Sequence, residues 1–209
     1  MKKFIMGFIV VCLSICTLAF VGCGGNSSKS EEEQFNEAKQ QFDNYTAEMK
    51  GSYFSYGESS EFSVNLLWDN DKLKIEVKDD SESYVNYYKE NNGKVYYYEN
   101  ESAEWIETEF NTLKEFMKGS ADNQAMVFLN ILPSFTYSDF KTEEEFFVAT
   151  EQMLNFYNAT LQVPFESIKL KMKDSKFISA SITSKYNDSK ENWEFIFKDY
   201  ASTKVTLPA

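Results

Sequence analysis

Residues 62–78 read FSVNLLWDNDKLKIEVK, and this stretch decides the class of fold. Apolar and polar residues alternate from position 62 to 66 and again from 72 to 78. A period of two predicts strands that each have one apolar face and one polar face. Residues 68–71 between them have the composition of a hairpin turn, so we expect the two strands to pair antiparallel.

The same period of two continues on both sides of this hairpin. Upstream it begins at Tyr45, after an amphipathic helix whose start is marked by a capping box of Ser30 and Glu33. Downstream, the turn sequence at 91–94 joins two further strands that are rich in tyrosine. Residues 44–110 are therefore expected to form an antiparallel meander.

The middle of the chain has helical spacing of its apolar residues. Asn111 is expected to cap a first short helix, and residues 122–132 to form a second. Thr142 and Glu145 make a further capping box, which predicts a third helix that continues to residue 157. These helices are apolar over more than one stripe, which predicts that they are covered on several sides.

Strand patterns return from residue 168, with turns expected at 173–176 and 187–190 and a last strand at 205–207. The order helix, strands, helices, strands requires no parallel βαβ unit. The sequence therefore predicts an α+β fold, in which helices cover the concave face of one strongly curved antiparallel sheet.

The N-terminus has the pattern of an export signal. Lys2 and Lys3 precede an apolar run at 4–21, and small residues follow it. A transmembrane helix is the alternative, because about 18 apolar residues can just span a bilayer. No basic cluster follows the run, which favours a signal peptide.

Residues 20–23, Phe-Val-Gly-Cys, resemble the lipobox of bacterial lipoproteins, with phenylalanine in place of the usual leucine. This resemblance implies cleavage before Cys23 and a diacylglycerol on its sulfur, and two acyl chains suffice for stable anchoring. We therefore expect a signal peptide at 1–22, a lipidated cysteine with a flexible tether at 23–30, and a folded domain at 31–209. The protein would then lie on the extracytoplasmic face of the cell membrane, held by its lipid.

The composition argues against several classes of function. The chain has no histidine and no arginine, and its cysteines are Cys12, Cys16 and Cys23, so cleavage would leave only the lipidated one. Disulfides, thiol nucleophiles and histidine or thiolate metal sites are not expected, and we predict a non-enzymatic monomer without cofactor or metal. The formal net charge of −12 makes nucleic acid and anionic lipid headgroups poor partners.

Three segments carry a resemblance to a known superfamily: the hairpin at 68–75, the tyrosine-rich segment at 92–98 with Trp105, and the C-terminal segment at 195–208. They resemble the LolA/LolB and LppX superfamily of lipoprotein carriers and lipid-binding lipoproteins. The resemblance implies an unclosed half-barrel whose helical lid covers an apolar cavity for acyl chains. Soluble LolA carriers are not lipidated and use an arginine at the cavity mouth, so this chain is closer in type to the anchored LppX-like proteins.

The resemblance implies a binder of an acyl chain or another hydrophobic ligand. A lipid carrier needs a roomy and adaptable apolar slot, which methionine and phenylalanine suit. The same residues can alternatively fill an ordinary core. The candidates for lining the cavity are Met126, Leu129, Leu132, Phe146, Phe147, Met153 and Phe156.

The rival hypothesis is a non-catalytic module at the cell surface that binds a protein or an envelope polymer. Tyr96, Tyr97, Tyr98 and Trp105 would then form a platform that stacks on sugars. Successive residues of a strand point to opposite faces, so at least one of the three tyrosines should face solvent. Ordinary strand propensity explains such tyrosines as well.

Overall fold

The computed structural model describes residues 29–79, 82–119, 124–186 and 188–209. The expected signal peptide, Cys23 and the expected turn residue Asn187 lie outside this part of the chain. Its helices include none with the length and apolar composition that a membrane crossing requires. The first elements are α2 (Glu31–Lys39), β1 (Asn44–Ser55), β2 (Glu58–Asp69), β3 (Lys72–Asp79), β4 (Ser83–Asn91), β5 (Lys94–Glu99) and β6 (Glu104–Glu107). The remaining elements are α3 (Leu113–Gly119), α4 (Gln124–Ile131), two 3₁₀ turns (Leu132–Ser134 and Tyr137–Asp139), β7 (Phe140–Glu143), β8 (Phe146–Ala149), α5 (Glu151–Leu161), β9 (Phe165–Lys173), β10 (Lys176–Tyr186) and β11 (Ser189–Lys198).

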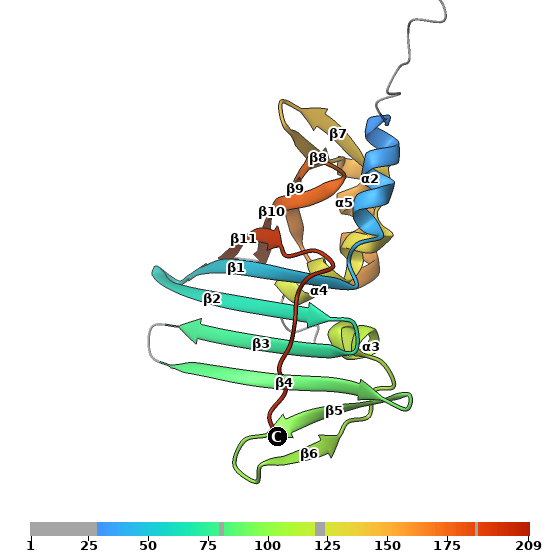
Figure 1. Ribbon diagram of the computed structural model, residues 1–209. Coiled ribbons are helices and arrows are strands. Elements are labelled where there is room, and N and C mark those ends of the chain that lie inside the picture. The colour runs from blue at the N-terminus through green and yellow to red at the C-terminus, as the bar shows by residue number, and fades with distance from the viewer. Residues whose placement is uncertain (1–28, 80–81, 120–123, 187) are drawn as a thin grey trace, which may run out of the picture. The chain divides into compact units, whose positions relative to one another are not determined.

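The strands of the described residues form one antiparallel sheet in the order β6-β5-β4-β3-β2-β1-β11-β10-β9-β8-β7. β1 and β11, the first and last strands in the sequence, pair side by side in its interior (Figure 1). The sheet does not close into a barrel, because β6 and β7 remain as its two edges. The predicted α+β fold with one unclosed antiparallel sheet is therefore confirmed.

Helices cover the apolar face of the sheet. In α2, the ring of Phe35 lies 5.2 Å from the ring of Phe177 in β10. In α4, the ring of Phe128 lies 4.8 Å from the ring of Phe195 in β11. All four side chains are buried, so these helices and strands share one hydrophobic core.

Local turn chemistry sets the register of the hairpins. Asn92 and Gly93 both have positive φ and close the β4–β5 hairpin, a geometry that matches the twist of paired strands. The turns expected at 68–71 and 173–176 are also found, each between paired strands. The meander predicted for residues 44–110 is therefore confirmed.

The first half of the third predicted helix is wrong. Residues 140–149 form the β7–β8 hairpin, whose turn contains Glu144 with a positive φ. Burial alternates along β8: Phe147 and Ala149 are buried, and the residues before each of them are half-buried. The strand also pairs with β9. Helix α5 starts only after Thr150, whose Oγ1 accepts a hydrogen bond from Met153 N at 3.2 Å. A short alternating strand before a helix gives almost the same apolar spacing as one longer helix.

The cap of α3 differs by one residue from the predicted one. Thr112 Oγ1 accepts a hydrogen bond from Glu115 N at 3.1 Å, and the Glu115 carboxylate accepts one from Asn111 N at 3.0 Å. This arrangement satisfies two N–H groups at the start of the helix. Thr112 therefore holds the capping position that the sequence assigned to Asn111.

The C-terminal residues 205–207 are not a strand, contrary to the prediction. Both sides of β11 are already paired, with β1 and β10, so no neighbouring edge is available. The segment instead passes over the end of β2, where Val205 N donates to Asp69 Oδ2 at 3.2 Å (Figure 1). Thr203 N also donates to Asn44 Oδ1 at 2.9 Å, so side chains replace the backbone partners of a strand.

Candidate ligand-binding site

The seven residues predicted to line a cavity occupy three environments. Phe156 is 61% exposed on α5. Phe146 is half-buried on β8, and Lys171 Nζ lies 5.7 Å from the centre of its ring. The five buried candidates are Met126, Leu129, Leu132, Phe147 and Met153.

The region between α2 and the strands β7–β10 is packed with aromatic rings. Phe35 of α2 is fully buried, and its ring lies 5.2 to 6.1 Å from four other rings, those of Tyr137, Phe140, Phe147 and Phe177. Edge-to-face contacts of this kind fill space at the density of a protein interior. Phe147 therefore contributes to packing here.

An apolar hollow of about 270 Å³ lies where α2, α3 and α4 meet the start of β1 and the end of β2. We call it the mouth hollow, and Leu129 is the predicted lining residue that borders it. Its apolar lining residues are Phe42, Tyr45, Trp68, Leu129 and Pro133, and its polar ones are Lys39, Gln40, Asp43, Lys114 and Asn130.

The register of β1 and β2 produces the aromatic floor of the mouth hollow. Tyr45 lies opposite Trp68, and their rings stack with centres 6.2 Å apart. Trp68 Nε1 donates to Asn70 O at 2.9 Å, so the indole is fixed in place. Burial, and next the charge of Asp43, raises the pKa of the Tyr45 phenol well above its usual range, so the phenol in this floor stays neutral even where an exposed tyrosine would ionise.

Two lysines lie at the rim of the mouth hollow. Lys39 Nζ donates to Phe135 O at 2.5 Å, and Lys114 Nζ lies 2.8 Å from Asp43 Oδ1. Lys114 and Asp43 are both mostly exposed, so their ion pair is weak and can open. The rim therefore carries two ammonium groups and one carboxylate above the aromatic floor.

Sequence reasoning missed Tyr45 and Trp68 as lining residues. The register that joins them follows from the β1–β2 turn at Tyr56 and Gly57, where Ser55 pairs with Glu58. That turn was the available signal, because counting back from it places residue 45 opposite residue 68.

Among the α-helices of the described residues, α5 has the fewest buried side chains. Met153 is its one fully buried residue. The Tyr157 ring lies 5.2 Å from the Phe135 ring, and the Asn158 amide makes two hydrogen bonds of 2.9 Å with the backbone N and O of Phe165. Low burial of side chains is typical of elements that open locally at low cost in free energy, so we expect α5 to open more readily than the other helices.

The aromatic residues of β5 and β6 do not form an open platform. Tyr96 and Tyr98 share one face of β5 while Tyr97, on the other face, lies opposite Tyr88. Lys89 Nζ lies 3.9 Å from the centre of the Trp105 ring. The ammonium group therefore covers the face of the indole on which a sugar would stack. The ring of Tyr98 lies 5.3 Å from the same indole.

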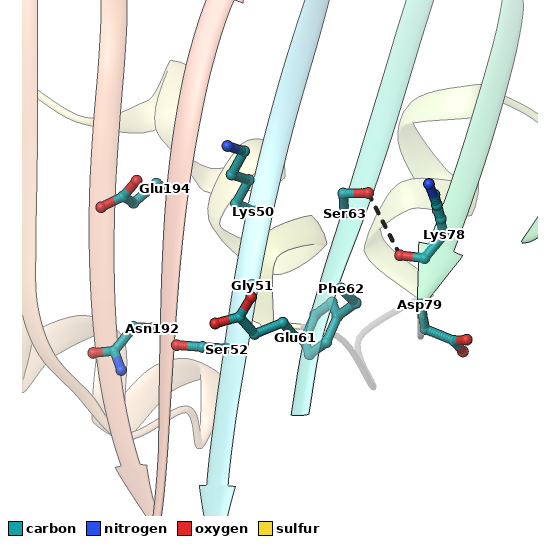
Figure 2. A pocket seen from close by; sticks show the side chains of 10 residues that line it. All are labelled: Lys50, Gly51, Ser52, Glu61, Phe62, Ser63, Lys78, Asp79, Asn192 and Glu194. Carbon is teal, nitrogen blue, oxygen red and sulfur yellow. Dashed lines mark hydrogen bonds between the residues drawn. The ribbon is translucent and has the colours of Figure 1, made fainter. Parts of the chain in front are cut away.

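A second hollow, of about 460 Å³, opens on the polar face of β1, β2, β3 and β11 (Figure 2). Lys50, Lys78, Glu61 and Glu194 are among its lining residues, so it mixes both charges and offers little apolar surface. Over the residues that the structure describes, no group of three histidine, cysteine or carboxylate side chains is placed to hold a metal ion.

No protein-family model and no curated protein matches the chain. Among solved structures it is similar to the MucA/MucB complex of Pseudomonas aeruginosa, with 8% identity over 84% of this chain and 62% of that chain, at a TM-score of 0.36. It is also similar to a DUF1329 family protein from Desulfovibrio piger, with 7% identity over 83% of this chain and 93% of that chain, at a TM-score of 0.32. Likeness at these scores carries no argument about function, which has to come from the site itself.

Proposed function

We propose that this protein is a lipoprotein, anchored through Cys23 on the extracytoplasmic face of a membrane, that binds the apolar end of an amphiphile in the mouth hollow. The observation that carries the proposal is the lining, in which Phe42, Tyr45, Trp68 and Leu129 lie beneath the two lysines of the rim. The unclosed sheet with covering helices is in keeping with the resemblance to LolA and LppX proteins. Binding is non-catalytic in this proposal.

The size of the mouth hollow sets the extent of binding. Pockets that enclose a small ligand usually measure about 300 to 1,000 Å³, so the hollow of about 270 Å³ takes part of an acyl chain. Burying about five methylenes from water gains roughly 4 kcal/mol. The same chain gains almost nothing on leaving a bilayer, where it is already dry, so the ligand is an amphiphile met in water or at the membrane surface.

Binding is tested with the chain from residue 24 to Ala209, which contains the whole described core and lacks Cys23. The probe is palmitate brominated on its chain, because bromine quenches tryptophan fluorescence at short range. Trp68 lines the mouth hollow, so we expect saturable quenching that unmodified palmitate reverses. Quenching that is absent, or that does not saturate, would overturn the proposal.

A matched pair of variants locates the site. Asn130→Phe places a ring in the mouth hollow, and Asn155→Phe makes the same change on the exposed side of α5. We expect the first variant to weaken palmitate binding by about tenfold or more and the second to leave it unchanged. Equal effects of the two variants would contradict binding in the mouth hollow.

The anchor is tested separately, with the full chain expressed in a bacterium and labelled with radioactive palmitate. We expect label in the wild-type protein and none in Cys23→Ala, which should also leave the membrane fraction or keep its signal peptide. Equal labelling of both would contradict lipidation at Cys23.

A further inference from the structure

The hollow of about 460 Å³ on the polar face of the sheet is lined by two parallel rows of side chains. The pairing of β11, β1, β2 and β3 sets these rows, and Figure 2 shows them one beside the other. Neighbouring rows on one face of a sheet are two residues apart along a strand, which is about 6.6 Å. The first row consists of Glu194, Lys50, Ser63 and Lys78, and the second of Asn192, Ser52 and Glu61.

Lys50 and Lys78 are exposed and lie on either side of Ser63 in the first row. Over the described residues, no carboxylate lies within ion-pair distance of either ammonium group. Two strand spacings of about 4.8 Å separate the two lysines, so both side chains can reach one anionic group placed between them. The carboxylates of the adjoining row already have lysine partners, in the pairs Glu48–Lys198 and Glu76–Lys74.

Glu61 is the carboxylate of the second row, and within the described part of the chain it has no lysine partner either. Glu194 lies opposite Lys50 in the first row. Asp79 Oδ1 accepts a hydrogen bond from Glu82 N at 2.7 Å, and Figure 2 shows the Asp79 side chain directed away from the rows. The charges of the two rows therefore balance, which favours a ligand that carries both charges over a polyanion or a polycation.

We propose that this hollow binds a dipeptide with free termini, whose carboxylate lies between Lys50 and Lys78 and whose ammonium group lies at Glu61. Two residues of an extended chain span about 7 Å, which matches the spacing of the two rows. A free amino acid carries both charges on one Cα, about 3 Å apart, so it cannot reach both rows. A third residue would carry one terminus beyond them.

Ser52 and Asn192 supply hydrogen-bonding groups for the peptide bond of such a ligand. Thr183 Oγ1 donates to Asn192 Oδ1 at 3.1 Å, which leaves the amide nitrogen of Asn192 as a donor for a ligand carbonyl. The Ser52 hydroxyl can donate or accept. The volume of about 460 Å³ is within the range of about 300 to 1,000 Å³ that is usual for small-ligand sites.

This site lies on the opposite face of the sheet from the mouth hollow, so it goes beyond the proposed function. The chain from residue 24 to Ala209, labelled with ¹⁵N, is titrated with L-alanyl-L-alanine (dialanine) while its amide chemical shifts are recorded. We expect saturable shifts at Lys50, Ser52, Glu61 and Ser63. Alanine, trialanine and dialanine capped at both ends should each bind more weakly, by on the order of tenfold. Absence of saturable shifts at these residues, or equal affinity for any comparison ligand, would overturn the proposal.

Matched substitutions of exposed residues locate the site. Lys78→Gln and Glu61→Gln each remove one charge from the rows, and we expect either to weaken dialanine binding by about two- to fivefold. Lys190→Gln, beyond Asn192 on the same face, and Glu58→Gln, at the β1–β2 turn, make the same changes outside the hollow and should leave binding unchanged. Palmitate quenching should be at the wild-type level in all four, which separates this site from the mouth hollow. Equal effects inside and outside the hollow would refute the proposed site.

Discussion

The substitution Gly51→Ala tests why the rings of Phe62 and Trp193 can meet across β1. We infer that they meet because Gly51 has no side chain. Gly51 of β1 pairs with Phe62 on one side and Trp193 on the other. A Cβ atom at Gly51 would lie 2.3 Å from Cε2 of the Phe62 ring and 2.7 Å from its Cζ. Contacts this short do not occur, so Gly51→Ala requires the ring to leave its position.

The cost follows from what the Phe62 ring contacts. It lies 4.6 Å from the ring of Trp193 at an angle of 72°, and Trp193 is a fully buried core residue. Losing the edge-to-face pair costs about 0.5 to 1.5 kcal/mol, and exposing part of the Phe62 ring costs about 1 kcal/mol more. Replacing a glycine within a strand by alanine returns about 0.5 to 1 kcal/mol. We therefore expect Gly51→Ala to lower the free energy of unfolding by about 0.5 to 2 kcal/mol.

The assay is a double-mutant cycle in urea on Gly51→Ala, Phe62→Ala and their combination. Without the Phe62 ring, the added methyl group meets no obstacle, so the second substitution should be neutral or stabilise by up to about 1 kcal/mol. Ser52→Ala, on the opposite face of β1, is the control and should stay within about 0.5 kcal/mol of wild type. An equal cost of Gly51→Ala in both backgrounds would falsify the steric explanation.

Two further predictions concern Glu191 and helix α5. Burial raises the pKa of the Glu191 carboxyl, and the hydrogen bond from Trp193 Nε1 offsets this only in part. The folded chain then binds that proton more tightly than the unfolded chain, so its contribution to stability is lost as pH rises from about 4 through the raised pKa. Thermal midpoints should therefore decline less between pH 4 and 7 in Glu191→Gln than in wild type, and identical slopes would contradict this. Asn158→Ala removes both hydrogen bonds to Phe165 and should lower the local stability of α5 by about 1 to 3 kcal/mol, measured as faster amide exchange there; unchanged exchange would show that α5 is held by other groups.

Most strands of the fold could be predicted from the sequence because their signals are local. The alternation in 72–78 and the turn residues Asn92 and Gly93 act within a few positions, and the structure places a strand and a hairpin there. The pairing of β1 with β11 has no local signal, since it joins residues about 150 positions apart. This pairing arises because the two halves of the chain bury their apolar faces in one shared hydrophobic core.

The position at which one helix starts explains why part of the candidate site could not be predicted. A single helix from residue 142 would have carried Phe146, Phe147 and Phe156 on one element. Because Thr150 starts α5 instead, Met153 and Tyr157, four residues apart, face the core and Phe156 faces outward. The floor of the mouth hollow depends on a pairing between strands, which the composition of either strand alone does not specify.

The packing of the core limits which kind of lipid handling the proposed function can include. Complete extraction of an acyl chain from a bilayer needs a cavity that encloses it, because partial removal leaves apolar surface in water. Rings such as Phe35 and Phe147 occupy the region beneath α2, so a larger cavity requires a helix to move. Helix α5 buries one residue fully, and its displacement would uncover Phe135 beside Phe128. Under the proposed function, the mouth hollow in this conformation would hold the end of an acyl chain, and extraction would require α5 to open first.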